Sequence, residues 1–334
     1  MRGHKKKTAW TERRRARAIE RLIAAAMLAL AAMLAWGSGH AAERPGSCPA
    51  SAPAHSSLHQ QIVATRAGPL AYYRFGHGTP LLLITGYRST VSQWNGAFLD
   101  ALASRHDVIV LENPGVGGSR SDHPPETMEG LADTVSDFIE ALQLRRVDVL
   151  GWSMGGMVAQ KLALEHPQQV KALVLMSTAP PGPKATPVSP SMLAVLSGHT
   201  DSPFDAIMGA LFPPGAKAQA VQCFRSEMFH PGDYGHVSVD ERVAGAQLQA
   251  MSAWWNDDRA AAALKHVKVP ALVIVGSADS VLSPDNARLL TQSLSNATLD
   301  EVPNTGHALM YQDPFGTADR IDRFLSHSPH YNSR

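Results

Sequence analysis

A serine stands between two glycines at the spacing that a nucleophilic hydroxyl requires. The residues Gly151-Trp152-Ser153-Met154-Gly155 follow an apolar run and precede a helical pattern. A strand that turns sharply into a helix holds a serine hydroxyl clear of its surroundings, but it crowds the positions two residues before and after the serine. Glycine is needed there because a β-carbon would clash. The pattern predicts a nucleophile at Ser153, and a serine that only caps the helix is the alternative.

A nucleophilic serine needs a base, and the base needs an orienting acid. His307 lies in a turn-rich loop directly after a strand-like run, and Asp279 follows another such run by a short loop. Because parallel-sheet enzymes place catalytic groups at the carboxyl ends of strands, we expect both side chains at the same sheet edge as Ser153. The alternatives are a surface histidine at 307 and turn chemistry alone at 279, with Asp285 as the rival acid.

Apolar strand-like runs alternate with amphipathic helical patterns along most of the chain. The clearest helix is predicted over 128–144, where apolar residues recur at spacings of three and four. Further helices are predicted around 94–102 and over 157–164, 287–294 and 318–325. Strands are predicted over 61–65, 70–75, 81–85, 107–111, 147–150, 172–176, 271–275 and 297–302, the first two as a hairpin with Gly68-Pro69 between them.

Runs that are apolar throughout and separated by helices predict an α/β fold, with a mostly parallel central sheet flanked by helices. The alternation stops over 180–265, which holds short helical patterns and no strong strand. An unstructured loop of that length is rare inside a compact domain, so we predict a helical cap insertion. The predicted organisation is a leader at 1–42, a linker at 43–58, core at 59–179, cap at 180–265 and core at 266–334.

Ser153, Asp279 and His307 occur in the chain order serine, acid, histidine, and each follows a predicted strand. With these motifs in this order, the chain resembles the α/β-hydrolase superfamily over about residues 60–326. The resemblance implies the fold of that superfamily and acyl transfer through a serine–histidine–aspartate triad. No cofactor is expected for this chemistry.

Two backbone amides are expected to bind the oxyanion of the reaction. One belongs to Met154, the residue after the nucleophile. The resemblance assigns the other to Tyr87, which follows Thr85-Gly86 at the end of a predicted strand. Most relatives have His-Gly at that point. Thr85 therefore departs from the superfamily at a position whose hydrogen bonds support the oxyanion loop.

Two patterns that resemble cofactor sites are interpreted otherwise. The acidic residue and glycine-rich turn at 112–119 are a further feature of the superfamily and are taken as structural, because the third glycine of a dinucleotide-binding motif is missing. His230, Asp233 and His236 lie in a Pro- and Gly-containing loop without a recognised ligand spacing. This loop is therefore predicted to be solvated, and no metal site is expected in it.

The predicted function is hydrolysis of a carboxylic ester, or a related small acyl compound, through an acyl-enzyme. A nucleophilic serine argues against the dehalogenase and epoxide-hydrolase relatives, which use an aspartate at that position. Thioesterase, amidase, carbon–carbon hydrolase and cofactor-free perhydrolase remain open, as does a non-catalytic ligand-binding protein.

Eight large apolar residues of the predicted cap are expected mostly to form its own core, with an acyl pocket as the alternative: Phe204, Met208, Phe212, Met228, Phe229, Met251, Trp254 and Trp255.

The amino-terminal residues have the pattern of an export signal. Nine of the 30 Lys and Arg lie in residues 1–21, so the remainder is acidic and suggests no nucleic-acid surface. An apolar run of 15 residues, 22–36, and then small residues predict a secretory signal cleaved near Ala41 or Ala42. The predicted location is periplasmic or secreted. An uncleaved membrane anchor at 22–36 is the alternative.

Two cysteines occur in the chain, Cys48 and Cys223. In an oxidising compartment they can pair, and separate thiols are the alternative, because sequence does not place them within bonding distance. The oligomeric state is left open by the sequence.

Overall fold

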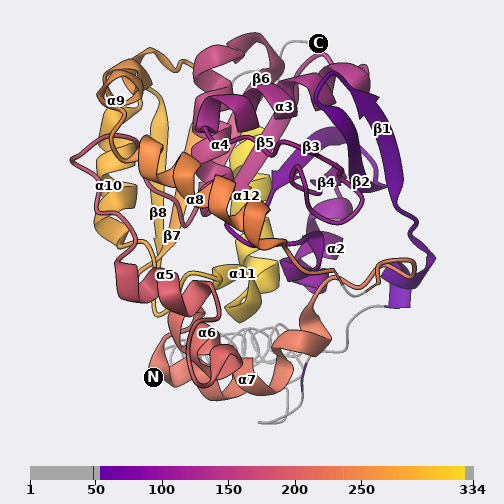
Figure 1. Ribbon diagram of the computed structural model, residues 1–334, viewed down its shortest axis with the longest axis vertical. Helices are drawn as coiled ribbons and strands as arrows, with labels where there is room; N and C mark the ends of the chain where they lie inside the picture. The colour runs from indigo at the N-terminus through magenta and orange to yellow at the C-terminus, as the bar shows by residue number, and fades with distance from the viewer. Residues whose placement is uncertain (1–47, 49–52, 236, 328–334) are drawn as a thin grey trace, which may run out of the picture. The chain divides into compact units, whose positions relative to one another are not determined.

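Eight strands form one sheet in the computed structural model, which describes residues 48, 53–235 and 237–327 (Figure 1). The strands are β1 (Gln61–Thr65), β2 (Gly68–Gly76), β3 (Thr79–Ile84), β4 (His106–Leu111), β5 (Val147–Trp152), β6 (Val170–Met176), β7 (Ala271–Gly276) and β8 (Ala297–Val302). Their order is β1-β2-β4-β3-β5-β6-β7-β8. β2 runs antiparallel to β1 and β4, and the other neighbouring pairs are parallel. The predicted mostly parallel sheet is confirmed.

The central strands are buried on both faces. Along β3, Leu82 and Ile84 point into one core and Leu81 and Leu83 into the other. Because successive side chains of a strand point to opposite faces, a strand buried on both sides has an unbroken apolar sequence. This explains the apolar runs from which the strands were predicted.

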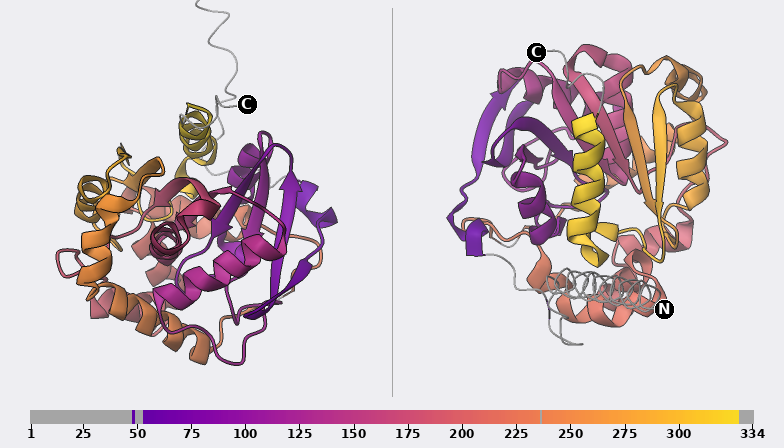
Figure 2. Two further views of the ribbon diagram at one scale, coloured as in Figure 1. Left: turned by 90° about the horizontal axis from the view of Figure 1, so that it is seen from above. Right: turned by 180° about the vertical axis from the view of Figure 1, so that it is seen from behind.

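Five helices cover the two faces of the sheet. The first core contains side chains of α3 (Met128–Ala141), α4 (Met154–Glu165) and α10 (Pro284–Ser293). The second contains side chains of α2 (Gly96–Ala103) and α12 (Pro314–His327). Accordingly, α3 and α4 lie in front of the sheet in Figure 1, and α12 lies in front of it in the view from behind in Figure 2.

The opening hairpin has a tighter turn than the sequence predicted. Gly68 and Pro69 belong to β2, and Gly68 pairs with Thr65, so only residues 66 and 67 connect the strands. Gly68 has a φ of 114°, which glycine adopts without the strain that a β-carbon would cause. Pro69 is tolerated because it lies near the start of its strand, beyond the residues that pair with β4.

A helical insertion connects β6 to β7, in agreement with the predicted fold class. Its helices are α5 (Pro190–Leu196), α6 (Pro203–Leu211), α7 (Pro214–Glu227), α8 (Glu241–Trp254) and α9 (Asp258–Ala263). No strand occurs among the described residues of this stretch. α6 packs against both α5 and α7. The short helix α11 (Leu309–Gln312) packs against α7 and lies below the sheet in Figure 1.

Most of the predicted leader and linker, residues 1–58, lies outside the described residues. The last part of that linker forms the short helix η1 (Pro53–Ser57). His55 is buried there, with its Nε2 2.8 Å from Oδ1 of Asp100. This part of the chain therefore belongs to the folded domain and is not a free linker. Among the described residues, no helix combines the length and apolarity that a membrane span needs.

A disulfide joins Cys48 to Cys223 on α7. The two residues are 175 positions apart in sequence, and their Cα atoms are 5.2 Å apart. A crosslink that closes a loop of this length restricts the unfolded chain by roughly 5 kcal/mol in the chain-entropy account. It also ties the insertion to the amino-terminal end of the domain.

One carboxylate is buried at the amino-terminal end of β5. Asp148 is 1% exposed, and neither of its oxygens has a hydrogen-bond partner among the described residues. The nearest cation is the Lys171 ammonium, 3.8 Å from Oδ2. Burial raises the pKa of Asp148 to about 6, because the charged form loses its hydration.

Asp148→Asn is expected to stabilise the protein at neutral and alkaline pH. Because its folded pKa lies above its unfolded value, the carboxyl contributes stability at low pH that is lost as the pH rises from about 4 through about 6. The free energy of unfolding of the variant should exceed that of the native protein by up to about 3 kcal/mol at about pH 8, and by almost nothing at about pH 4. Urea unfolding at both pH values measures this difference. The exposed control Asp201→Asn should change little, and an equal gain from Asp148→Asn at both pH values would contradict the expectation.

Candidate active site

Ser153 lies on a sharp turn between β5 and α4. Its φ of 57° and ψ of −121° form a conformation that residues other than glycine rarely adopt. The Ser153 amide donates to the carbonyl of Met176 at 2.9 Å, and the Ser153 carbonyl accepts from the Gly156 amide at 2.9 Å and the Thr178 hydroxyl at 2.7 Å. Met154, the first residue of α4, is fully buried. The predicted strand–turn–helix geometry is present.

Three glycines allow the turn to pack closely against its neighbours. A β-carbon added at Gly151 would lie 2.3 Å from the carbonyl oxygen of Gly155, and one at Gly155 would lie 2.2 Å from that of Ile84. A β-carbon at Gly156 would lie 2.6 Å from Cβ of Thr178. The turn is therefore pressed against the end of β3, from which the loop of residues 86–93 continues.

Asp279 and His307 meet beyond the carboxyl ends of β7 and β8. Nδ1 of His307 lies 2.8 Å from Oδ2 of Asp279, and both side chains are buried. The second oxygen, Oδ1, accepts hydrogen bonds from the amides of Val281 and Leu282, both at 2.9 Å. The indole N–H of Trp152 donates to the His307 carbonyl at 3.0 Å. These contacts fix the orientation of both the carboxylate and the imidazole.

The rival acid Asp285 does not take part in this pair. Its side chain is 77% exposed, and Oδ1 accepts a hydrogen bond from Arg288 at 2.6 Å. Asp285 lies in the first turn of α10, with its amide bonded to Oγ of Ser283. Of the two acids that the sequence left open, Asp279 is the one beside His307.

The loop that carries His230 and Asp233 is held by contacts of its own. Asp233 accepts a hydrogen bond from the hydroxyl of Tyr73 at 2.9 Å, and Nε2 of His230 lies 2.7 Å from the carbonyl oxygen of Arg225. His236 lies outside the described residues. The polar groups of His230 and Asp233 thus shape the loop.

The predicted oxyanion loop, residues 86–93, passes directly beside Ser153. A β-carbon added at Gly86 would lie 3.2 Å from Cβ of Ser153. The Thr85 hydroxyl accepts a hydrogen bond from Nδ2 of Asn113 at 3.0 Å. This buried contact with Asn113 anchors the start of the loop at Thr85.

Glu112 joins the same loop to the insertion. Its buried carboxylate accepts hydrogen bonds from the Val91 amide at 3.1 Å and from the hydroxyl of Tyr234 at 2.6 Å. Burial raises the pKa of Glu112 to about 7, although both hydrogen bonds act in the opposite direction. A β-carbon at Gly117 would lie 2.7 Å from Oε2, so the glycine-rich turn wraps closely around this carboxylate. These contacts agree with the structural interpretation of residues 112–119.

Helix α8 holds the loop from the other side. Arg88 has a left-handed φ of 51°, and its amide donates to Oε1 of Gln247 at 2.9 Å. Its guanidinium binds Glu241 at 2.6 Å, and the hydroxyl of Tyr87 lies 3.3 Å from that of Ser197. Gln247 and Glu241 were not predicted from the sequence. No motif marks them, because their role depends on where the insertion lies over the core.

Ser153, His307 and Tyr87 line one cavity of about 180 Å³. Its wall is mostly apolar, and the insertion supplies six of the side chains that form it: Leu196, Phe204, Ile207, Met208, Leu211 and Phe224. Phe204 and Met208 are among the residues for which the sequence left a pocket open as the alternative to a core, and the other four were not predicted. The site therefore opens onto a small apolar space between the core and the insertion.

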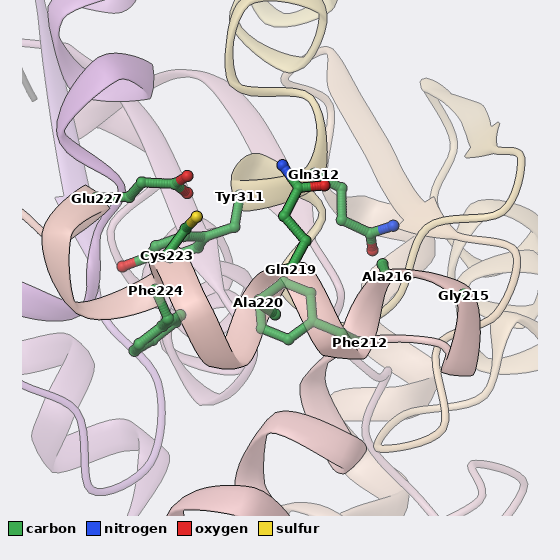
Figure 3. Close-up of a pocket in the computed structure, with 10 residues that line it drawn as sticks. All are labelled: Phe212, Gly215, Ala216, Gln219, Ala220, Cys223, Phe224, Glu227, Tyr311 and Gln312. Carbon is green, nitrogen blue, oxygen red and sulfur yellow. The ribbon is translucent and has the colours of Figure 1, made fainter. Parts of the chain in front are cut away.

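Five of the other six pocket candidates lie elsewhere, and the sixth, Met228, lines a larger cavity next to this one. Phe229, Met251, Trp254 and Trp255 are buried in the two cores. Phe212 lines a separate cavity of about 180 Å³ between α7 and α11, which shares the Phe224 side chain with the cavity at Ser153. Figure 3 shows the side chains of α7 around this second cavity, with Tyr311 and Gln312 of α11. None of the predicted triad residues lines it.

The chain belongs to the α/β-hydrolase fold family, whose sequence profile matches residues 79–314. It is 29% identical over 259 residues to a poly(3-hydroxyalkanoate) depolymerase of Ectopseudomonas oleovorans, which covers 75% of this chain and 85% of the relative. It is also 29% identical over 219 residues to a pimeloyl-[acyl-carrier protein] methyl ester esterase of Chromobacterium violaceum, covering 63% of this chain and 80% of that one.

The same fold is found in solved structures. An α/β-hydrolase fold protein from Chitinophaga pinensis superposes with a TM-score of 0.73 at 23% identity, covering 82% of this chain and 99% of that one. At that identity the likeness concerns the fold alone. The curated relatives named above are hydrolases, and hydrolysis is the activity class to which these comparisons point.

Gly155→Ala is expected to destabilise the protein by about 2–4 kcal/mol, because the added methyl group overlaps the backbone carbonyl of Ile84, which cannot move aside. Gly245→Ala in α8 is the matched control, since nothing lies within 4 Å of a β-carbon there. That change should stabilise by about 0.5–1 kcal/mol through helix propensity. Chemical denaturation of both variants measures the difference. A Gly155→Ala protein as stable as the control would show that the turn is not closely packed.

Proposed function

We propose that the protein is a serine esterase that cleaves a carboxylic ester through a covalent acyl-enzyme. The observation that carries the proposal is the buried His307–Asp279 pair, whose histidine lines the same cavity as the strained Ser153. A hydroxyl on a strained turn, an oriented imidazole and a buried carboxylate are the three parts that acyl transfer to a serine requires.

In the first step, Ser153 Oγ attacks the ester carbonyl carbon while Nε2 of His307 takes the hydroxyl proton. The Nδ1–H of His307 donates to Asp279, which stays ionised and stabilises the imidazolium. When the tetrahedral intermediate collapses, His307 passes the proton to the leaving alcohol, and the acyl group stays on Ser153. Water then attacks the acyl-enzyme with His307 again as the base, which releases the acid and restores the serine.

The amides of Tyr87 and Met154 bind the oxyanion in this proposal. Met154 begins α4, where the helix dipole favours negative charge. The hydrogen bonds of Thr85 and Arg88 hold the loop of Tyr87 from the core and from α8, so its amide needs little rearrangement as charge develops. Loss of one such donor typically costs about 3 kcal/mol of transition-state stabilisation.

The size and lining of the cavity support a substrate with a short apolar acyl group. Its volume of about 180 Å³ is small, below the roughly 300–1,000 Å³ typical of ligand pockets. Aliphatic and aromatic side chains of the insertion form its wall. The name of the methyl ester esterase describes a relative that acts on an ester, which supports the choice of an ester over a thioester or amide.

Activity assays of three variants test the triad. Turnover of p-nitrophenyl butyrate should fall by about 10⁴-fold or more in both Ser153→Ala and Asp279→Asn, since the nucleophile or the imidazole orientation is lost. Asp285→Asn is the control and should stay within about twofold of the native rate, because its exposed side chain binds Arg288 and is not the partner of His307. Circular dichroism and melting temperatures establish that each variant is folded. Residual turnover in folded Ser153→Ala equal to that of the native protein would reject the enzyme in favour of a ligand-binding protein.

We also propose that the mature domain acts outside the cytoplasm. The secretory pattern of residues 1–42 and the Cys48–Cys223 disulfide support this location, because disulfides persist in oxidising compartments. Terminal sequencing of exported protein is expected to find a new amino terminus near Ala41 or Ala42. Exported material that still begins at Met1 or Arg2 would rule out the processed form and favour the anchor.

A further inference from the structure

A third and larger cavity adjoins the one at Ser153. Its volume is about 790 Å³, and it lies between the loop of residues 86–93 and the segment that follows α7. Arg88 and Gln93 line both cavities, so the two are neighbours on either side of these side chains. An ester whose carbonyl lies at Ser153, with its acyl arm in the apolar cavity, would reach this polar cavity with an alcohol arm that passes Arg88 and Gln93.

The walls of the two cavities carry positive charge and no carboxylate. Arg88 and Arg225 supply this charge in the larger cavity, and neither set of described lining residues includes Asp or Glu. The guanidinium of Arg88 is paired with Glu241. Arg225 is exposed, and none of the ion pairs found among the described residues joins its guanidinium to a carboxylate.

An aromatic ring holds Arg225 at the boundary between the cavities. The guanidinium carbon lies 4.5 Å from the ring centroid of Phe204, which lines the apolar cavity. This cation–π contact limits the motion of the side chain and leaves the guanidinium edge able to donate. A planar guanidinium edge binds carboxylate or phosphate oxygens in pairs, which a lysine ammonium cannot do.

Gln93 adds neutral donors at the same boundary. Its Oε1 accepts a hydrogen bond from the Thr90 amide at 3.0 Å, and its carbonyl accepts one from the hydroxyl of Tyr311 at 3.2 Å. Both contacts fix the residue in place. Within the described residues, Nε2 of Gln93 has no hydrogen-bond partner, so its two N–H groups remain to supplement Arg225.

We infer that the alcohol arm of the substrate carries an anionic group, a carboxylate or a phosphate, which binds to Arg225 and Gln93. The inference rests on the proposed esterase activity and specifies its substrate class: a short apolar acyl group esterified to an alcohol that bears an anion. The apolar acyl arm occupies the smaller cavity, and the alcohol arm leaves past Arg88 into the larger one.

Two esters of matched size test this inference, 4-(butanoyloxy)benzoate and its neutral counterpart 4-(butanoyloxy)benzamide. The measured quantity is the ratio of their kcat/KM values, carboxylate over amide. For the native protein we expect a ratio of about 10, arising mainly from KM, because the charge-assisted hydrogen bonds form in the bound substrate. The phosphate analogue, 4-(butanoyloxy)phenyl phosphate, gives a second ratio of kcat/KM values, phosphate over amide. Whichever of the two ratios is larger identifies the preferred anion.

Arg225→Gln is expected to lower this ratio of kcat/KM values by about 5- to 10-fold. Arg225→Lys should lower it less, because lysine keeps the positive charge but lacks the planar guanidinium. The matched control is Arg259→Gln, an exposed arginine of α9 that lines neither cavity. It should leave the ratio unchanged. Raising the NaCl concentration from about 20 mM to about 500 mM should also lower the ratio for the native protein. This tests, without any substitution, whether the preference for the anionic ester depends on electrostatic attraction.

A native ratio near one, or an unchanged ratio in Arg225→Gln, would overturn the anion site while leaving the esterase intact. Failure of the native protein to hydrolyse either ester, together with no turnover of p-nitrophenyl butyrate, would instead overturn the esterase on which the inference depends. The two failures are therefore distinguishable.

Discussion

The close contact between the turn at Ser153 and the end of β3 is the constraint on which the rest of the site depends. Gly155 approaches the Ile84 carbonyl more closely than any side chain would permit. Because β3 continues into the loop of residues 86–93, this contact sets the distance between the serine and that loop. The strained backbone of Ser153 persists because β5 is paired on both sides and the turn is hydrogen-bonded to β6.

The loop beside Ser153 is held by two separate parts of the protein. The core contributes Asn113 and the buried carboxylate of Glu112, and α8 contributes Gln247. Glu112 also accepts a hydrogen bond from Tyr234, so one buried group connects the loop with the insertion. A loop fixed in this way presents its backbone dipoles in a constant direction, which is the condition for electrostatic stabilisation without reorganisation.

The insertion contributes apolar surface and charge to the same region. Phe204 belongs to the wall of the small cavity, and its ring also holds the guanidinium of Arg225. The disulfide attaches α7, which carries Cys223 and Arg225, to the amino-terminal end of the domain. The helices α6 and α7 therefore supply both most of the insertion's apolar wall of the cavity and the arginine beside it.

Features that depend on neighbouring residues could be predicted from the sequence. The elbow at Ser153 follows from glycines within two positions of the serine, and the strands follow from apolar runs that both faces of the sheet require. Errors in the predicted strands concerned their boundaries, as in the hairpin, where Gly68 and Pro69 are the start of a strand and not the turn. Four of the six apolar residues that the insertion places around the cavity were missed, because an apolar helix face looks the same whether it covers a core or a cavity.

The sequence by itself determined the fold family, the serine turn and the edge of the sheet at which an acid and a histidine must follow. Only the tertiary structure decided that Asp279 and not Asp285 meets His307, that Gln247 supports the loop at Arg88, and that Arg225 lies on Phe204. The physical reason is distance along the chain. Backbone turns and strand patterns are governed by adjacent residues, whereas these side-chain contacts join segments whose meeting depends on how every intervening helix is packed.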